Sequence, residues 1–216
     1  MINVYYIIFY IIDKSEKGEK ALVKIRKYID LVLSIMFIGS VILGYYDHIP
    51  CMGEYCFISG MATGIVFFAS FLSQHRNGKP LPTAIYLACA ANIFIIFAAT
   101  AAMGLNLEGA FIVIHILDPL LILAYWLVFC DSRTVKRRHT LSVLAFPMAY
   151  MVFALILFMA SGDCPFPARL IFVDSGAMRS AIVCVCVLAG LWAEGALIFM
   201  LNRLIRKKER FNALCA

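Results

Sequence analysis

The chain carries six long apolar stretches that are separated by short polar gaps. Each stretch holds about 17–25 residues, the length that a helix needs to cross roughly 30 Å of hydrocarbon. The stretches are approximately residues 28–46, 55–72, 83–103, 109–130, 141–160 and 180–201. This pattern predicts an all-α polytopic membrane bundle of six transmembrane helices. A segment 1–27 precedes the transmembrane domain 28–201, and a basic tail 202–216 follows it.

The basic residues fall in alternate gaps. All but two of the nineteen Lys and Arg residues lie before the first stretch, after the second, after the fourth or after the last. In the other gaps the only Lys or Arg residues are Arg169 and Arg179. Because cytoplasmic loops carry an excess of Lys and Arg, the distribution predicts that both termini are cytoplasmic.

Composition agrees with a membrane protein. The 216 residues are 63% hydrophobic and 15% charged, which leaves no room for a separate soluble domain. The net charge of +6 raises the question of nucleic acid binding. However, the basic residues flank the spans on one face and have no interleaved aromatic platform. We therefore expect membrane lipids, and no nucleic acid, as partners.

The extreme N-terminus, residues 2–12, is apolar but too short to span, because about eleven helical residues reach only about 16 Å. It lacks the basic region and the cleavage site of a signal peptide. We expect this segment to lie in the membrane interface. The alternative is a short seventh span that would place the N-terminus outside.

Most of the eight cysteines are expected to be packing residues or free thiols, because they lie in spans or on the cytoplasmic side. These are Cys89, Cys130, Cys184, Cys186 and Cys215. Cys51, Cys56 and Cys164 lie on the outer side, where two of them can form a disulfide, and the sequence does not name the pair. The spacing around Cys51 matches no usual zinc site, so no metal or cofactor is expected.

The candidate chemistry lies in the fourth stretch, which reads His115-Ile-Leu-Asp118-Pro119. His115 and Asp118 are three residues apart and share a helix face. They lie about 9 and 13 Å below the outer boundary, at 1.5 Å per residue. Ionisable residues inside a membrane usually have a function, so we interpret them as site residues. The other interpretation is that they form hydrogen bonds between helices and fix the bundle.

Two hydroxyl groups of the second stretch are expected at similar depth. Ser59 and Thr63 lie about 6 and 12 Å below the outer boundary and bracket His115. A hydroxyl beside an imidazole is the arrangement of nucleophile and general base. The same stretch carries Gly60 and Gly64, which predict a close approach of another helix.

The last stretch carries one carboxyl group, Glu194, at about 21 Å from the outer side. This depth is too great for the layer of His115. We expect Glu194 to pair near the cytoplasmic face with Asn202 or Arg203.

Five short motifs follow one another along the chain: Pro82-Thr-Ala-Ile-Tyr86, His115-Ile-Leu-Asp-Pro119, Trp126-Leu-Val-Phe129, Phe146-Pro147-Met-Ala-Tyr150 and Gly162-Asp-Cys-Pro165-Phe166. They extend from the third stretch to the C-terminal part of the chain. This ordered set resembles the bacterial Pr6Pr family of six-span membrane proteins. That family is similar to the eukaryotic androgen-induced-gene (FAR-17a/AIG-like) membrane hydrolases, and the resemblance implies a location in the bacterial inner membrane.

The resemblance implies hydrolysis of fatty-acid esters by a hydroxyl nucleophile and His115 as its base, with Asp118 beside it. The lipid ester would enter laterally from the bilayer. The Thr of the eukaryotic relatives has no direct counterpart here, so Ser59 or Thr63 would substitute, with Cys56 as a third candidate. Two other classes stay open. One is a small-solute or proton transporter that uses His115, Asp118 and Glu194 in turn, and the other is a non-catalytic assembly subunit.

Overall fold

The computed structural model describes residues 16–104, 107–173 and 177–214, and these residues are helical or irregular, with no strand among them. The long helices are α2 (Glu16–Tyr45), α3 (Tyr55–Asn77), α4 (Thr83–Met103), α5 (Asp118–Phe129), α6 (Ala145–Ser161) and α8 (Ala177–Leu214). The short elements are η1 (Ile49–Gly53), η2 (Val113–Leu117), η3 (Ser132–Thr134), η4 (Arg137–Leu144) and α7 (Ala168–Phe172). The predicted all-α class is confirmed.

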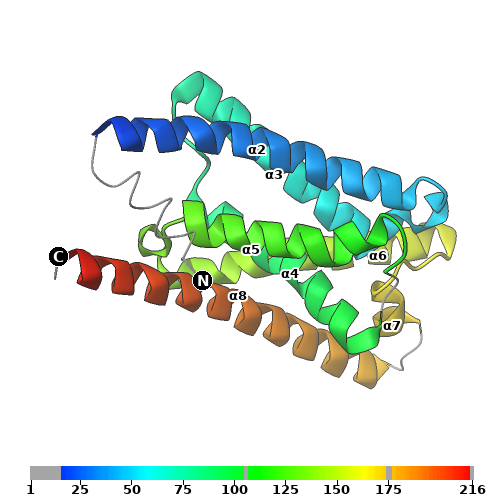
Figure 1. The fold of residues 1–216 in the computed structure, drawn as a ribbon. Helices are drawn as coiled ribbons and strands as arrows, with labels where there is room; N and C mark the ends of the chain where they lie inside the picture. The colour runs from blue at the N-terminus through cyan, green and yellow to red at the C-terminus, as the bar shows by residue number, and fades with distance from the viewer. Residues whose placement is uncertain (1–15, 105–106, 174–176, 215–216) are drawn as a thin grey trace.

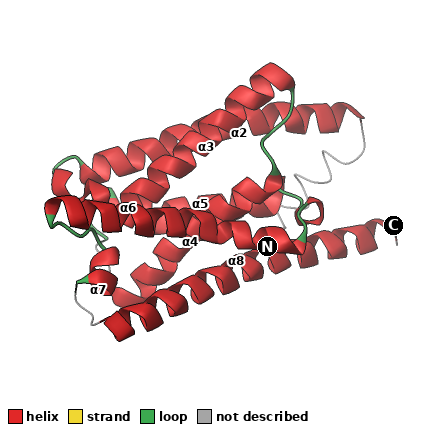
Figure 2. Cartoon of the chain, turned by 180° about the vertical axis from the view of Figure 1, so that it is seen from behind, coloured by secondary structure: helices red, strands yellow, loops and turns green. Residues whose placement is uncertain are grey.

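The helices form one elongated bundle (Figures 1 and 2). Helices α2 and α3 pack together along one side of it, and α8 runs along the opposite side. Helix α4 lies inside and contacts α3, α5, α6 and α8. Its small residues allow this, since Ala90 and Ala91 are both fully buried.

Five helices among the described residues are long and apolar enough to cross a membrane: Lys24–Tyr45, Tyr55–Asn77, Thr83–Ala102, Arg138–Ser161 and Ala181–Arg206. A shorter apolar helix, Val113–Phe129, corresponds to the predicted stretch 109–130. The predicted boundaries 83–103 coincide with α4. Other helices are longer than predicted: α2 begins before residue 28, and α8 continues past residue 201 to Leu214.

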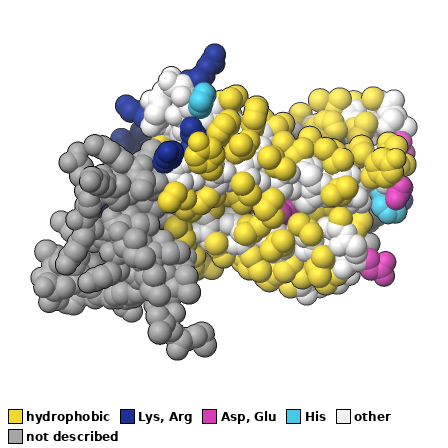
Figure 3. Space-filling view, turned by 45° about the horizontal axis from the view of Figure 1, so that its top comes forward, with side chains coloured by type: hydrophobic (Ala, Val, Ile, Leu, Met, Phe, Trp, Pro, Cys, Tyr) yellow, Lys and Arg dark blue, Asp and Glu magenta, His cyan; other side chains and the backbone are white. Residues whose placement is uncertain are grey.

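The surface of the bundle is apolar in the middle (Figure 3). Large apolar side chains such as Leu43, Met159 and Val185 are more than 60% exposed. On the face shown, Lys and Arg side chains gather at the end where α2 begins and α8 ends, and most acidic surface lies at the other end, with a small acidic spot in the apolar middle. This distribution is typical of a bilayer-embedded surface with one basic rim.

The contact between α2 and α3 depends on Gly60 and Gly64, the glycines from which a close helix approach was predicted. A Cβ atom at Gly60 would lie 2.5 Å from Val41 Cγ1, and one at Gly64 would lie 2.5 Å from Ile38 Cγ1. Gly64 also faces backbone, because its Cβ would lie 3.2 Å from Ser34 O. The predicted close approach is confirmed, and α2 is the helix that makes it.

The connection between α6 and α8 contains one short helix among its described residues. Gly162 ends α6 in the left-handed region, with φ of 79°. Helix α7 then packs against α6 and α8, with Ala168 and Ile171 buried. The N-terminal segment 2–12, for which an interfacial position was predicted, lies outside the described residues.

Candidate active site and a second buried polar cluster

A π-helical segment presents His115 to the interior of the bundle. Residues Val113–Leu117 form η2, and the N–H of Asp118 donates to Val113 O, five residues back. Pro119 has no N–H to donate to the carbonyl one turn earlier, which favours this wider turn. His115 is 4% exposed and Asp118 is 2% exposed. π segments of this kind frequently occur at functional sites.

Asp118 pairs with a serine of the first helix. Ser40 Oγ donates to Asp118 Oδ2 at 2.6 Å, and it also lies 3.1 Å from Phe37 O in its own helix. Asp118 Oδ1 is buried without a hydrogen-bond partner. Sequence reasoning missed Ser40, although a serine inside an apolar stretch is the same kind of signal that singled out Ser59.

Ser59 lies in the same layer of the bundle as Ser40 and Asp118. Helix α3 approaches α2 at Gly60 and Val41, and α5 approaches α2 at the adjacent Ser40. Ser59 is 1% exposed, and its hydroxyl donates to Cys56 O of its own helix at 3.3 Å. The structure therefore brings Ser40, rather than Ser59, into direct contact with Asp118.

The other predicted hydroxyl, Thr63, lies one turn deeper along α3. It is 2% exposed and lies within hydrogen-bonding reach of the Cys89 thiol on α4. Thr63 is thus placed toward α4, whereas the Ser40–Asp118 pair joins α2 and α5.

Aromatic rings pack against His115. Its ring stacks on Phe111, with centroids 5.7 Å apart. Phe111 in turn meets the edge of Tyr45 at 5.3 Å, and the Tyr45 hydroxyl donates to Glu54 at 3.0 Å. The imidazole therefore packs against an aromatic group that extends to Tyr45.

A second polar cluster lies toward the opposite end of α2. Asp30 Oδ2 accepts hydrogen bonds from Ser70 and from Gln74 Nε2, the latter at 2.7 Å. Ser70 also bonds with Tyr86. Arg26 Nε donates to the Tyr125 hydroxyl at 2.9 Å, and its guanidinium lies over the Tyr125 and Tyr86 rings.

Sequence reasoning missed this second cluster. Arg26 was read only as a topology signal, and Asp30 lies just inside the first predicted stretch. The signal that could have found the cluster is an Asp inside an apolar run, together with Ser70 and Gln74 one helical turn apart.

Glu194 does not pair with Asn202, the first of the two partners predicted for it. Asn202 Nδ2 donates to Trp126 O at 2.8 Å and to Cys130 O at 3.1 Å, and its Oδ1 accepts from Ser132 N. Both the N–H groups and the oxygen of this amide are therefore hydrogen-bonded at the C-terminal end of α5, where backbone carbonyls lack partners within the helix. Glu194 Oε1 is buried without a hydrogen-bond partner.

Cys51, Cys56 and Cys164, the cysteines predicted to lie on the outer side, form no disulfide with one another in this structure. Burial is the main factor that raises the pKa of the Cys51 thiol above its ordinary value, and the nearby Glu54 carboxylate raises it further.

Comparison of the chain with known protein families, with curated proteins and with solved structures finds no match in any of the three. The functional argument therefore depends on the geometry of these buried polar groups.

Proposed function

We propose that the chain is a six-span integral membrane protein whose two termini lie in the cytoplasm. The five long apolar helices and the shorter Val113–Phe129 supply the six spans. The alternate placement of Lys and Arg along the sequence, and their gathering at one end of the bundle, support the orientation. The resemblance to Pr6Pr proteins favours the bacterial inner membrane.

We propose further that the layer around His115 hydrolyses fatty-acid esters of membrane lipids. The observation that carries this proposal is the hydrogen bond of 2.6 Å from Ser40 Oγ to Asp118 Oδ2, three residues from the buried His115. A hydroxyl is a poor nucleophile until a neighbouring base removes its proton. The hydrogen bond to Asp118 supports Ser40 as this hydroxyl, so we assign the nucleophile to Ser40.

The reaction proceeds in two balanced steps. Ser40 Oγ bonds to the ester carbonyl carbon while its proton passes to Asp118, and the protonated imidazole of His115 gives a proton to the departing alcohol oxygen. Water then attacks the acyl-serine, its proton passes to His115, and Asp118 returns the proton to Ser40 as the fatty acid leaves. A lipid ester reaches this layer laterally from the outer leaflet, because His115 lies only about 9 Å below the outer boundary.

The test is labelling by a fluorophosphonate probe of the purified protein in lipid nanodiscs. We compare wild type with four single variants: Ser40→Ala, Ser59→Ala, Thr63→Ala and His115→Ala. The proposal expects labelling of wild type, Ser59→Ala and Thr63→Ala, and its loss in Ser40→Ala and His115→Ala. Tryptic mapping of the labelled peptide then identifies the modified residue directly.

Thermal unfolding of the same samples separates catalysis from packing. An enzyme loses labelling while the His115→Ala variant keeps a cooperative transition. Labelling that disappears with Ser59 instead of Ser40 moves the nucleophile to α3. An unlabelled wild type, with every variant folded, rejects the hydrolase and favours the transport or assembly classes.

A further inference from the structure

Glu194 is a carboxyl group close to the middle of an apolar helix. It belongs to the segment Ala181–Arg206 of α8 and lies about 20 Å along the helix from the first of these residues and about 18 Å from the last. The hydrolase proposed above makes no use of it. An ionised carboxyl group at such a depth in a membrane is costly, and groups of this kind usually have a function.

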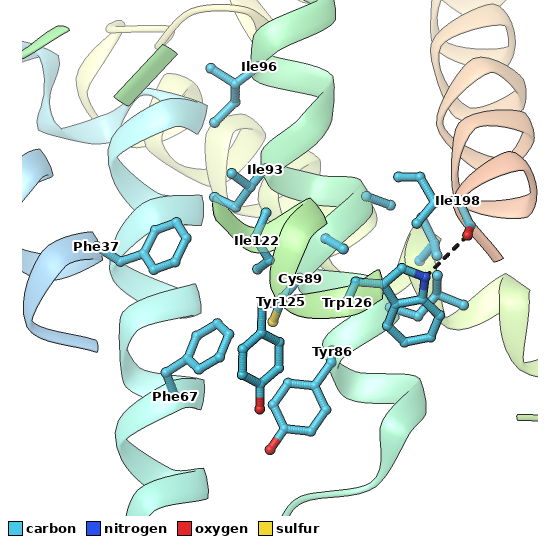
Figure 4. Close-up of a cluster of buried hydrophobic side chains, with 14 of the residues drawn as sticks. Phe37, Phe67, Tyr86, Cys89, Ile93, Ile96, Ile122, Tyr125, Trp126 and Ile198 are labelled. Atoms are coloured by element: carbon cyan, nitrogen blue, oxygen red, sulfur yellow. Dashed lines mark hydrogen bonds between the residues drawn. The ribbon is translucent and has the colours of Figure 1, made fainter. Parts of the chain in front are cut away.

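Contacts on one side of α8 fix the position of Glu194 around the helix axis. Trp126 Nε1 of α5 donates to Ile198 O at 3.2 Å, and Figure 4 shows this bond joining the two helices. A Cβ atom at Gly195 would lie 2.8 Å from Val143 Cγ2 of η4. Glu194 lies beside this packed face of α8, and its Oε1 is buried.

No described side chain supplies a positive charge or a proton to Glu194. None of the described Lys, Arg and His residues forms an ion pair with it, Arg203 included. Its Oε1 accepts no hydrogen bond. A carboxylate left in this way is unfavourable in an apolar environment, and a bound proton removes its charge.

Tyr55 of α3 is the titratable group that faces Glu194 among the described residues, and its proton is committed elsewhere. The two side chains are close enough to interact electrostatically. The Tyr55 hydroxyl donates to Asn92 Oδ1 at 2.6 Å. Asn92 Nδ2 donates to Ala88 O at 2.6 Å and to Val143 O at 3.4 Å, so this amide cannot be reversed without placing oxygen against oxygen. The single proton of the phenol therefore belongs to the amide oxygen and is not shared with Glu194.

Gly190, one turn before Glu194, leaves the carboxyl group open on its other side. Side chains of an α-helix lean toward the N-terminus, so Glu194 lies over the turn that contains Gly190. Gly190 is exposed, and a Cβ atom there would have nothing within 4 Å. Leu197, on the following turn, is 66% exposed. Glu194 thus lies at the edge of the apolar surface that faces lipid in the proposed topology.

We propose that Glu194 is a proton-binding site in the middle of the membrane, and that its neutral carboxyl group reacts with apolar carboxyl reagents that enter from the bilayer. This inference rests on the proposed membrane position of α8 and is independent of the hydrolase. With a carbodiimide, the carboxyl proton passes to one nitrogen of the reagent while the carboxyl oxygen bonds to its central carbon. The acyl group then moves from that oxygen to the other nitrogen, which leaves a stable N-acylurea that contains the whole reagent.

The test treats the full chain in lipid nanodiscs with dicyclohexylcarbodiimide and, separately, with a water-soluble carbodiimide at equal concentration. Peptide mass spectrometry measures the adduct on Glu194 over a series of pH values. The variants are Glu194→Gln, which removes the carboxyl group, and Gly190→Leu, which covers the turn beside it. In the matched controls, Glu54→Gln removes a carboxyl group that has a donor in Tyr45, and Gly39→Leu adds the same side chain at an open glycine of α2.

We expect the apolar reagent to modify Glu194 in wild type, in Glu54→Gln and in Gly39→Leu, and the water-soluble reagent to leave it unmodified. The yield falls as pH is raised, because the reaction needs the carboxyl proton. Gly190→Leu reacts several-fold more slowly than Gly39→Leu, and Glu194→Gln gives no adduct at position 194.

Thermal unfolding establishes that each sample is folded before treatment. An unmodified Glu194 in folded wild type, or a yield that does not change with pH, overturns the proposal. Equal modification by the water-soluble reagent, or equal rates for Gly190→Leu and Gly39→Leu, also overturns it, because the carboxyl group is then not reached from the lipid. Fluorophosphonate labelling reports on Ser40 and His115, so failure of the hydrolase leaves these results unchanged.

Discussion

Single polar side chains in this bundle are held by contacts between helices that are distant in sequence. Ser40 and Asp118 are 78 positions apart, yet their side chains meet at 2.6 Å. Asp118 Oδ1 is already without a partner. The serine hydroxyl is thus the donor that partly compensates a buried carboxyl group, whatever chemistry the pair performs.

Replacing Ser40 by alanine should therefore destabilise the fold as well as abolish labelling. The loss of a buried donor to a carboxyl group costs about 1–2 kcal/mol. Unfolding of the variant in mixed detergent micelles measures the difference. Ser161→Ala is the control, because that hydroxyl is exposed and bonds only locally: it donates to Leu157 O and accepts from Asp163 N. A Ser40→Ala protein as stable as wild type would show that Asp118 does not depend on this bond.

A second prediction at this scale concerns the Cys51 thiol. Its pKa is raised first by burial and then by the Glu54 carboxylate. A raised thiol pKa means less thiolate at a given pH, so alkylation by iodoacetamide at mildly alkaline pH should be slower than in the denatured chain. Glu54→Gln removes the negative charge and should lower the pH at which the rate rises. Peptide mass spectrometry follows Cys51 separately from the other thiols, and an unchanged pH profile in Glu54→Gln would contradict this account.

The sequence was sufficient to predict His115 and Asp118 as buried polar groups on one turn, because their spacing and surrounding apolar residues are local information. Their partner Ser40 was not predictable. The side chain that meets Asp118 depends on how α2 and α5 are rotated against each other, and residue spacing within one helix does not determine that rotation. The same reason hid the Asp30 cluster, whose members come from α2, α3, α4 and α5.

Among the elements, the α2–α3 pair shows how small residues determine helix contact. Gly60 and Gly64 allow α3 to approach the ridge of Ile38 and Val41 on α2. In a bilayer, where apolar burial does not favour helix association, close packing of this kind holds helices together. The two glycines differ in what an added methyl group would meet.

Gly64→Ala should destabilise the protein more than Gly60→Ala. At Gly64 the new Cβ would lie 3.2 Å from backbone atoms of α2, so the helices must separate, at a cost of about 1–3 kcal/mol. At Gly60 the close contact is with the Val41 side chain, which can adjust. Gly39→Ala, with nothing within 4 Å of its Cβ, should be neutral or slightly stabilising. Thermal unfolding orders the three variants, and equal losses for Gly64→Ala and Gly39→Ala would reject the packing argument.

At the scale of the whole molecule, the apolar pattern predicted the helical class and most helix positions. The third apolar stretch, 83–103, coincides with α4, which Pro82 precedes and Gly104 ends. The lengths of α2 and α8 were underestimated, since hydropathy marks where a helix leaves the apolar region rather than where its hydrogen bonding stops. The predicted fourth stretch contains only a 17-residue helix, whose first turn is π-helical.

The final prediction concerns the number and direction of the membrane crossings. An even number of spans places both termini on the same side of the membrane. Single cysteines at Asn77 and at Asp163 are introduced after the native cysteines have been replaced by serine. The proposed topology expects a membrane-impermeant maleimide to label position 163 in intact cells and position 77 only after permeabilisation. Arg133→Cys, in the connection between α5 and α6, should behave like position 77. Labelling of position 133 from the outside, with position 77 protected, would mean that Val113–Phe129 does not cross the membrane. The depth of His115 counted from the outer boundary would then be wrong.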